Sequence, residues 1–429
     1  MRSRLHSAIS SEYRKCTRHD CRSTSARLGR GSAPKPGEPA YRPPTTMLVD
    51  PRFEALATQF FHLFHRTRDG GGALAVYLHG RPVLDVWAGW ASPIRKWDSE
   101  TVTLSFSTGK GVASTVLHRL AQRGLVDYDT PVAAYWPEFG EAGKESITVR
   151  ELLSHRAGLH RIRGLVPGRL ALLDHDRVTA ALAAAVPDPR RTKMPGYHAV
   201  TYGTLIAELT ARVAGKPFTE LVRTEVAEPL GIPEFWFQVP ESEKARIAKV
   251  FPHINPFGVP WGLTSLTLSR VPRLKDIADA GMPEGFDLLV RNPTIHDFVM
   301  PGWNGVFSAR ALARMYAAFA NDGVVDGIRF LEPDTIAQLS EVQTRARDYV
   351  LGIRMNWRLG YHAALVAART QHSGAFGHYG MGGSGAFADP DTGLSVAFVT
   401  NRLGNAVTPF ADLRLPSLGA RAESLAHNL

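Results

Sequence analysis

The stretch Leu104–Val112, with the sequence Leu-Ser-Phe-Ser-Thr-Gly-Lys-Gly-Val, determines how the rest of the chain is interpreted. Apolar residues follow it at helical spacing and predict an amphipathic helix ending near residue 123: Val112, Val116 and Leu120. Residues three apart share a helix face, with Cβ atoms about 5–6 Å apart, so the Lys110 amine can reach the Ser107 hydroxyl. The stretch therefore places a nucleophile beside a base, provided that burial or a nearby cation lowers the pKa of the lysine.

The same Ser-x-x-Lys spacing also occurs by chance elsewhere in the chain. Ser32 and Lys35 fit it, but Pro34 lies between them in a segment rich in Pro, Gly and Ser, so no helix is expected to hold this pair together. Spacing alone therefore does not make Ser107 catalytic, and the interpretation depends on further motifs.

The composition is that of an ordinary globular protein. The chain has 429 residues, 44% of them hydrophobic and 21% charged, which allows two domains or one large domain. The longest alanine-rich run, residues 178–186, is far too short to cross a bilayer, so no membrane span is predicted.

Most of the net charge of +10 belongs to the first 46 residues, which hold ten Lys or Arg residues against three Asp or Glu residues. The rest of the chain carries only a small positive charge, so nucleic-acid binding is not indicated. We predict that residues 1–46 form a disordered basic tail, because they are rich in Ser, Arg and Pro and lack the apolar core of a secretory signal. We expect a cytoplasmic location, with association with the cell envelope left open.

Both cysteines, Cys16 and Cys21, lie in this tail with His19 between them. Two thiols and one imidazole are fewer than a zinc site needs, so no metal is predicted. No motif in the chain indicates a cofactor.

Helical and strand patterns follow one another in an order that indicates an α+β fold. An amphipathic helix after Asp50 is followed by two apolar runs, 73–79 and 82–90, that predict an antiparallel hairpin. The centre of the chain predicts helices at residues 178–186, 202–214 and 218–230. Later segments predict a helix after Ser308, strands at 348–357, 383–388 and 394–400, and a C-terminal helix at 416–429.

We therefore expect a sheet domain built from both ends of the chain, residues 47–105 and 308–429. A mainly helical domain, residues 106–307, is expected between them. Its segment from about residue 232 to 303 is rich in Pro, Phe and Trp and could cover a pocket, because ligand sites are lined by apolar and aromatic groups. Ordinary packing of a long connection is an equal alternative for this segment.

Further motifs accompany the first one, in a fixed order along the chain. They are Ser107-Thr108-Gly109-Lys110, Leu152–Leu159, Tyr197 followed by Tyr202-Gly203, Asn304–Ala309 and Gly377-His378-Tyr379-Gly380. This pattern closely resembles the serine beta-lactamase-like family and, within it, the class C-related esterases known as family VIII carboxylesterases. The likeness extends from about Asp50 to Arg402.

The resemblance implies a beta-lactamase/transpeptidase-like fold, in which an antiparallel sheet flanked by helices adjoins a helical domain and the active site lies between them. It implies that Ser107 is the acylated nucleophile and that Lys110 and Tyr197 share proton transfer. It also implies an oxyanion hole made by the backbone N–H groups of Ser107 and Met381. A substrate-binding strand motif is implied as well, with His378 and Gly380 as its residues.

The chemistry of the residues agrees with these roles. Tyr and Lys side chains both titrate near about pH 10 when unperturbed, so neither alone is a good base at neutral pH. In a partly buried cleft, an ammonium would favour the Tyr197 phenolate and desolvation would favour neutral Lys110, and either state can accept the Ser107 proton. We therefore treat the two groups as a coupled pair.

Two positions depart from the family pattern. The usual Tyr-x-Asn motif is Tyr197-His198-Ala199 here, so the amide that contacts the acyl-amide of a beta-lactam is missing. His378 replaces the lysine that helps to recognise a carboxylate, and a histidine is mostly neutral at pH 7. Both departures favour an uncharged ester as the substrate.

Ser384 does not offer a second nucleophile motif. It lies in Gly382-Gly383-Ser384-Gly385, but Ala386 stands where the last glycine of Gly-x-Ser-x-Gly is needed. An α/β-hydrolase is therefore not expected.

The sequence thus predicts a serine hydrolase, most simply a carboxylesterase that cleaves small esters with short to medium acyl chains through a Ser107 acyl-enzyme. Three alternatives stay open: an acyltransferase, a weak beta-lactamase or D-alanyl-D-alanine peptidase, and a non-catalytic binder of peptides or cell-wall fragments. The oligomeric state is not predicted.

Overall fold

The computed structural model describes residues 43–65, 68–251, 267, 270–271, 274–283, 285–364, 374–403 and 412–427. The tail predicted for residues 1–46 lies almost entirely outside these ranges. Within them, none of the helices combines the length and the apolar character needed to cross a membrane.

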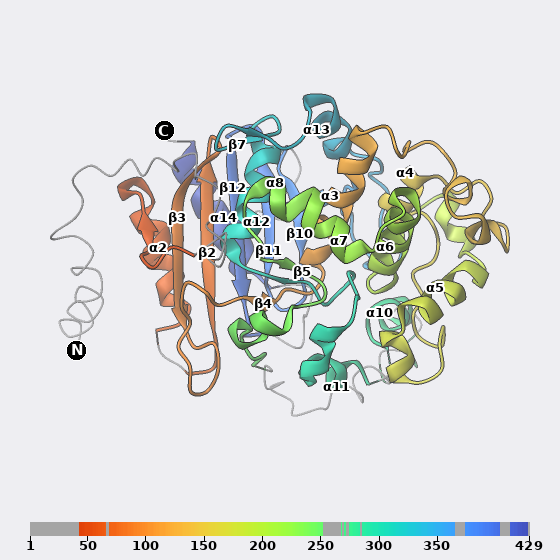
Figure 1. The fold of residues 1–429 in the computed structure, drawn as a ribbon, viewed down its shortest axis with the longest axis horizontal. Helices are drawn as coiled ribbons and strands as arrows, with labels where there is room; N and C mark the ends of the chain where they lie inside the picture. Colours follow the sequence, from red (N-terminus) through yellow and green to blue (C-terminus); the bar gives the residue numbers. More distant parts are fainter. Residues whose placement is uncertain are drawn as a thin grey trace. The chain divides into compact units, whose positions relative to one another are not determined.

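A seven-stranded antiparallel sheet draws its strands from both ends of the chain (Figure 1). The strand order is β1-β3-β2-β12-β11-β10-β9. The strands are β1 (Leu48–Val49), β2 (Gly71–Leu78), β3 (Arg81–Gly89), β9 (His362–Ala363), β10 (Phe376–Tyr379), β11 (Gly385–Asp389) and β12 (Leu394–Thr400). The central pairing of β2 with β12 therefore joins segments more than three hundred residues apart in the sequence, with Leu78 opposite Leu394.

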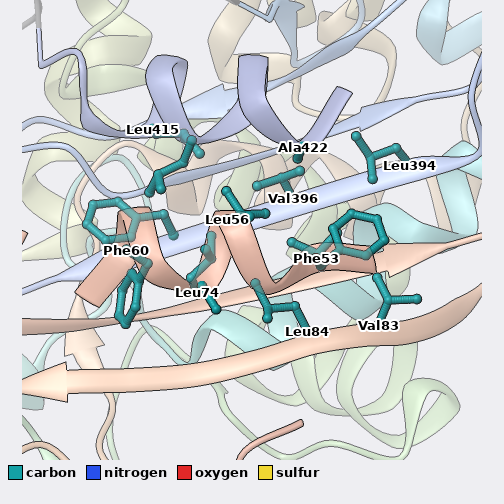
Figure 2. Close-up of a cluster of buried hydrophobic side chains, with 14 of the residues drawn as sticks. Phe53, Leu56, Phe60, Leu74, Val83, Leu84, Leu394, Val396, Leu415 and Ala422 are labelled. Atoms are coloured by element: carbon teal, nitrogen blue, oxygen red, sulfur yellow. The ribbon is translucent and has the colours of Figure 1, made fainter. Parts of the chain in front are cut away.

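One face of this sheet is covered by α2 (Glu54–His62) and α14 (Arg414–Ala426). Side chains alternate between the faces of a strand, and the aliphatic side chains of this face pack with those of the two helices. This cluster, here called the apolar core, includes Phe53, Leu56, Phe60, Leu74, Val83, Leu84, Leu394, Val396, Leu415 and Ala422 (Figure 2). All of its members are buried, so hydrophobic burial holds these elements together.

The opposite face of the sheet packs against α12 (Ala309–Ala320). Ser395, which alternates with the core residues of β12, donates a hydrogen bond from Oγ to the Ala313 carbonyl at 2.7 Å. Ser308 caps this helix, because its hydroxyl accepts a hydrogen bond from the Ala311 N–H. A long buried helix thus lies directly against the strands.

Helix α3 (Thr108–Gln122) packs against β10 and α6 (Figure 1). Further α-helices are found along the chain. They are α4 (Val149–Leu153), α5 (His175–Ala184), α6 (Thr201–Ala214), α7 (Phe218–Val222), α8 (Glu228–Leu230), α10 (Lys275–Gly281), α11 (Phe286–Arg291) and α13 (Pro333–Ser340). Two smaller sheets complete the fold, one formed by β4 (Thr103–Leu104), β6 (Val306–Phe307) and β5 (Phe235–Trp236), and one by β7 (Val324–Val325) and β8 (Ile328–Arg329).

Most predicted elements are confirmed, and one is wrong. The strand predicted at 348–357 is a series of turns joined by two isolated bridges, Thr344 to Trp357 and Arg347 to Arg354. The Asp348 carboxylate accepts hydrogen bonds from the N–H groups of residues 350 and 351, which a strand would have used for pairing. Asn356 also has a positive φ of 47°, so the segment cannot remain extended.

Candidate active site

Ser107 lies where β4 ends and α3 begins. Every residue from Thr101 to His118 is buried except Ser107, so the serine is the most exposed residue of this stretch. Ser107 is the N-cap residue of α3, but its side chain makes no capping hydrogen bond and is free for other contacts. The preceding residue, Phe106, has a φ of 50°, which is rare for an aromatic residue and turns the chain sharply before the serine.

Lys110 is fully buried on the first turn of α3 and points back to Ser107. Its Nζ lies 2.7 Å from Ser107 Oγ and 2.6 Å from each of two backbone carbonyl oxygens, those of Ala199 and Gly302. Burial lowers the pKa of Lys110 well below its usual value, because desolvation penalises the ammonium form. Within the described ranges, no carboxylate forms an ion pair with Lys110, so no negative charge compensates the desolvation of its ammonium form.

Tyr197 lies in the loop before α6 and reaches the same point. Its side chain is hydrogen-bonded to Ser107, and its ring centre lies 5.2 Å from Lys110 Nζ. The structure therefore brings the hydroxyl, the amine and the phenol together, although Tyr197 lies 90 residues after Ser107 in the sequence.

Burial acts on both partners of the pair and favours the uncharged form of each. It raises the pKa of the Tyr197 phenol, an effect that the hydrogen bond with Ser107 only partly opposes, while it lowers the pKa of Lys110. Of the two protonation states considered from the sequence, the geometry favours neutral Lys110 over the Tyr197 phenolate. A neutral amine has two N–H donors, which the two carbonyls accept, and a lone pair that is left for the Ser107 proton.

Tyr202, the other tyrosine of the motif, does not take part in this cluster of hydrogen bonds. It lies inside α6, as the sequence predicts, and its Oη lies 2.8 Å from Ser114 Oγ. Two neighbouring phenols thus have different partners, and the one next to Ser107 is Tyr197.

The backbone around Met381 lies close to the serine turn. A Cβ atom at Gly380 would lie 2.2 Å from the Ser105 carbonyl oxygen, so only glycine allows this approach of β10 to the start of α3. Within the described residues, the N–H groups of Ser107 and Met381 donate to no intramolecular acceptor. Both donors are therefore available to a substrate oxygen.

His378 lies on β10, and only 1% of its surface is exposed. Its ring centre lies 6.3 Å from that of Tyr197 and 5.0 Å from that of His362. Burial lowers the pKa of His378 well below its usual value, so the imidazole is neutral at pH 7. This position therefore supplies no positive charge for a substrate carboxylate.

Sequence reasoning missed the carbonyls of Ala199 and Gly302 that hold the Lys110 amine. The residue type does not indicate which backbone carbonyls will contact a lysine. Two glycines in the sequence nevertheless indicate a close approach of the two segments. A Cβ atom at Gly203 would lie 1.8 Å from the Gly302 nitrogen, so these two glycines let α6 and the 300–304 loop meet beside Lys110. Asp348 and Trp357, which contact Tyr197 through its N–H group and its ring, were also missed.

The described residues provide no group of side chains that could bind a metal ion. Among the residues that the structure describes, no three His, Cys, Asp or Glu side chains are grouped so that they could hold an ion. The chemistry that the arrangement itself can perform is activation of a hydroxyl beside a neutral amine.

Comparisons with known proteins indicate the family of the chain. The family model described as beta-lactamase matches residues 57–420. The chain is 40% identical over 368 residues to the esterase/beta-lactamase LipL of Mycobacterium tuberculosis, with 83% of this chain and 82% of that protein covered.

Two solved structures show the same fold. A family VIII carboxylesterase superposes with a TM-score of 0.75 at 32% identity and covers 89% of this chain and 98% of its own. A penicillin-binding protein homologue from Caulobacter crescentus gives a TM-score of 0.73 at 32% identity, with 88% and 99% covered. The resemblance inferred from the sequence motifs is thus confirmed, and so is the α+β fold with its antiparallel sheet and flanking helices. The chain belongs to the serine beta-lactamase-like family and is a hydrolase with the beta-lactamase fold, similar to family VIII carboxylesterases.

Proposed function

We propose that this protein is a serine carboxylesterase that cleaves small, uncharged esters with short to medium acyl chains through an acyl-enzyme on Ser107. The observation that carries the proposal is the contact of 2.7 Å between Lys110 Nζ and Ser107 Oγ, in surroundings that keep the amine uncharged.

Acylation begins when Ser107 Oγ attacks the ester carbonyl carbon while its proton moves to the lone pair of Lys110. The carbonyl oxygen becomes an oxyanion, and the free N–H groups of Ser107 and Met381 are suited to stabilise it; one such donor typically contributes about 3–4 kcal/mol. When the carbonyl re-forms, the bond to the alcohol oxygen breaks, and that oxygen takes a proton from the Lys110 and Tyr197 pair.

Deacylation repeats these steps with water as the nucleophile. Water gives a proton to the pair, its oxygen attacks the acyl carbon, and the bond to Ser107 Oγ breaks. The acid leaves and the hydroxyl regains its proton. Tyr197, hydrogen-bonded to Ser107, is placed to pass protons between the serine, the leaving alcohol and the amine.

Two side chains support an uncharged substrate. His378 is neutral at pH 7, so it cannot pair with a carboxylate as a lysine would. Residue 199 is an alanine, whose methyl group cannot bind the acyl-amide of a beta-lactam as the usual asparagine amide would.

Beta-lactam hydrolysis is the second candidate, because the 40% identical relative from Mycobacterium tuberculosis is named both esterase and beta-lactamase. It would use the same acyl-enzyme, with the ring nitrogen as the leaving group. The methyl group of Ala199 argues that this reaction is slower than ester hydrolysis.

One set of assays tests the proposal and its alternatives. We expect the protein to hydrolyse p-nitrophenyl butyrate faster than a chromogenic cephalosporin, and Ser107→Ala to reduce ester turnover by about 10⁴-fold or more. Product formation that depends on an added alcohol would instead indicate an acyltransferase. Faster turnover of the cephalosporin would favour the second candidate, and no turnover of either substrate would indicate a binding protein.

A further inference from the structure

The loop that carries Tyr197 has no regular secondary structure, yet the backbone N–H groups around Tyr197 are hydrogen-bonded to two buried residues. Gly196 N–H donates to the carbonyl of His155 at 2.9 Å, and His198 N–H donates to His155 Nδ1 at 3.1 Å. Between them, Tyr197 N–H donates to Asp348 Oδ1 at 3.2 Å. The conformation of this loop is therefore fixed by hydrogen bonds to two residues from other segments.

Asp348 is fully buried, and its carboxylate accepts hydrogen bonds from several N–H groups. Besides Tyr197 N–H, Oδ1 accepts from the N–H groups of Val350 and Leu351, both at 2.9 Å, and Oδ2 accepts from the Trp357 indole Nε1 at 2.9 Å. Burial raises the pKa of Asp348 to about 6 and these hydrogen bonds oppose the shift, so the carboxylate is ionised at pH 7. No guanidinium or ammonium group pairs with it within the described ranges, so hydrogen bonds alone compensate its burial.

Trp357, which Asp348 fixes through its indole, also contacts the Tyr197 ring directly. The two rings are stacked, with centres 5.5 Å apart and planes at 14°. His155 packs against both rings, with centre distances of 5.1 Å to Tyr197 and 4.1 Å to Trp357. Asp348 thus acts on Tyr197 at two points, through its backbone and through the ring on which the phenol is stacked.

We propose that Asp348 is a positioning residue for the reaction, which holds the Tyr197 phenol at Ser107 by accepting hydrogen bonds from the Tyr197 N–H and the Trp357 indole. This inference rests on the proposed role of Tyr197 in proton transfer. Asp348 does not contact Ser107 or Lys110 and exchanges no proton with them.

The physical reason is that proton transfer needs a phenol at hydrogen-bonding distance from the serine, and an irregular loop does not supply that precision by itself. A displacement of about 1 Å can reduce a rate by about 10²-fold. An ionised carboxylate that binds four N–H groups is a stiff anchor, because moving it would leave buried donors without an acceptor.

Two substitutions of Asp348 test the proposal by kinetics with p-nitrophenyl butyrate. Asp348→Ala removes all four acceptor contacts and is expected to reduce kcat by about 10²-fold with little change in KM. Asp348→Asn preserves the shape but turns an N–H donor toward either the indole or the backbone donors, so we expect a smaller loss, about tenfold. The Asn variant keeps the test valid if the Ala variant fails to fold.

A double-mutant cycle with Tyr197→Phe separates positioning from a general structural effect. If Asp348 acts through the phenol, its substitution reduces kcat in the protein with Tyr197 but has little further effect in the Tyr197→Phe protein. Equal losses in both backgrounds would overturn the proposal, and so would full activity of the Asp348 variants. Full activity of Tyr197→Phe itself would instead overturn the role proposed for Tyr197, so the two failures are distinguishable.

Asp389→Asn serves as the matched control. Asp389 is also a buried aspartate, and it accepts hydrogen bonds from Asp391 N–H and Thr392 Oγ1 in the turn between β11 and β12. It lies at the opposite end of β11 from Gly385, the residue that pairs with Tyr379. We expect its kcat to match that of the unmodified protein, and a loss as large as that of Asp348→Asn would overturn the proposal.

Discussion

The apolar core between α2, α14 and the sheet differs in kind from the interior along α3 and around Tyr197. The first is built from aliphatic and phenylalanine side chains (Figure 2). The second, here called the polar interior, contains buried titratable residues: Lys110, His118, His155, Tyr197, His198, Asp348, His362 and His378. Burial of apolar surface stabilises the fold wherever the shapes match, whereas every polar group in the second region needs a partner at a particular place.

The difference shows that one region mainly stabilises the fold, whereas the other provides the groups for catalysis. The apolar core contributes free energy of folding and has no titratable group that reacts to pH. The polar interior lowers the pKa of an amine and positions a phenol, at the cost of burying groups that water would otherwise solvate. Substitutions in the apolar core should therefore lower the stability, and substitutions in the polar interior should lower kcat.

The largest effect is expected from removing the phenol of Tyr197. Tyr197→Phe should lower kcat for p-nitrophenyl butyrate by about 10²- to 10⁴-fold, because general acid–base transfer through the phenol is lost. The melting temperature should change little. Steady-state kinetics and thermal unfolding of the same preparation measure both quantities.

Tyr202→Phe is the matched control for this substitution. Tyr202 is also buried, but its hydroxyl is hydrogen-bonded to Ser114, so its removal should cost about 1 kcal/mol of stability and leave kcat almost unchanged. Equal losses of activity in both variants would show that the two phenols are not distinguished in the way that the structure indicates.

Phe60→Ala should have the converse effect. Phe60 is fully buried in the apolar core and packs edge-on against Phe64 and Phe398, so truncation should lower the free energy of unfolding by about 3–5 kcal/mol. Once corrected for the folded fraction, kcat should be retained. Urea unfolding with active-site titration checks this, and a folded variant with much lower kcat would argue against the separation of the two regions.

Acid should destabilise the polar interior in a specific pH window. Burial lowers the pKa of His118 to about 4, whereas the unfolded chain takes up the proton near pH 6.5. The unfolded state therefore binds more protons between these values, and stability falls as the pH decreases from about 6.5 towards 4. At pH 5 this single group accounts for a loss of about 2 kcal/mol relative to pH 7.

Replacing His118 with Gln should make the loss of stability between pH 7 and pH 5 smaller by that amount. The comparison uses the difference between the two pH values, so any constant cost of the substitution cancels. An unchanged pH dependence would mean that His118 takes up its proton in the folded protein as readily as in the unfolded chain.

The smallest effect is expected at the surface. Lys216 and Glu220 form an ion pair at 2.8 Å at the start of α7, with both side chains solvent-exposed. Such pairs contribute little because water and salt screen them. Glu220→Ala should leave both the melting temperature and kcat within experimental error, and a clear change in either would indicate a role that the contacts of this pair do not explain.

The sequence predicts the apolar core better than the polar interior. The apolar core produces periodic patterns, so the sequence predicts the helix after Asp50 and the strands β2, β3, β11 and β12 close to where they are observed. Local spacing also predicted the proximity of Ser107 and Lys110, because both lie on the first turn of α3.

The polar interior could be predicted only in part. Family motifs pointed to Tyr197, but the carbonyls of Ala199 and Gly302 and the carboxylate of Asp348 belong to segments that meet only in three dimensions. The sequence predicts a strand at 348–357, whereas the Asp348 carboxylate binds N–H groups of this segment and the chain forms turns. A sequence pattern of apolar and polar residues does not indicate that a side chain will accept hydrogen bonds from the backbone of a distant loop.

The most direct test of the central claim, that this polar interior makes the Ser107 hydroxyl the nucleophile, is acid quenching during turnover of p-nitrophenyl butyrate followed by peptide mass mapping. We predict a butyryl group on the peptide that contains Ser107, located on that residue by fragmentation and absent from Ser107→Ala. A butyryl group on another residue such as Ser384, with turnover retained in Ser107→Ala, would contradict the account.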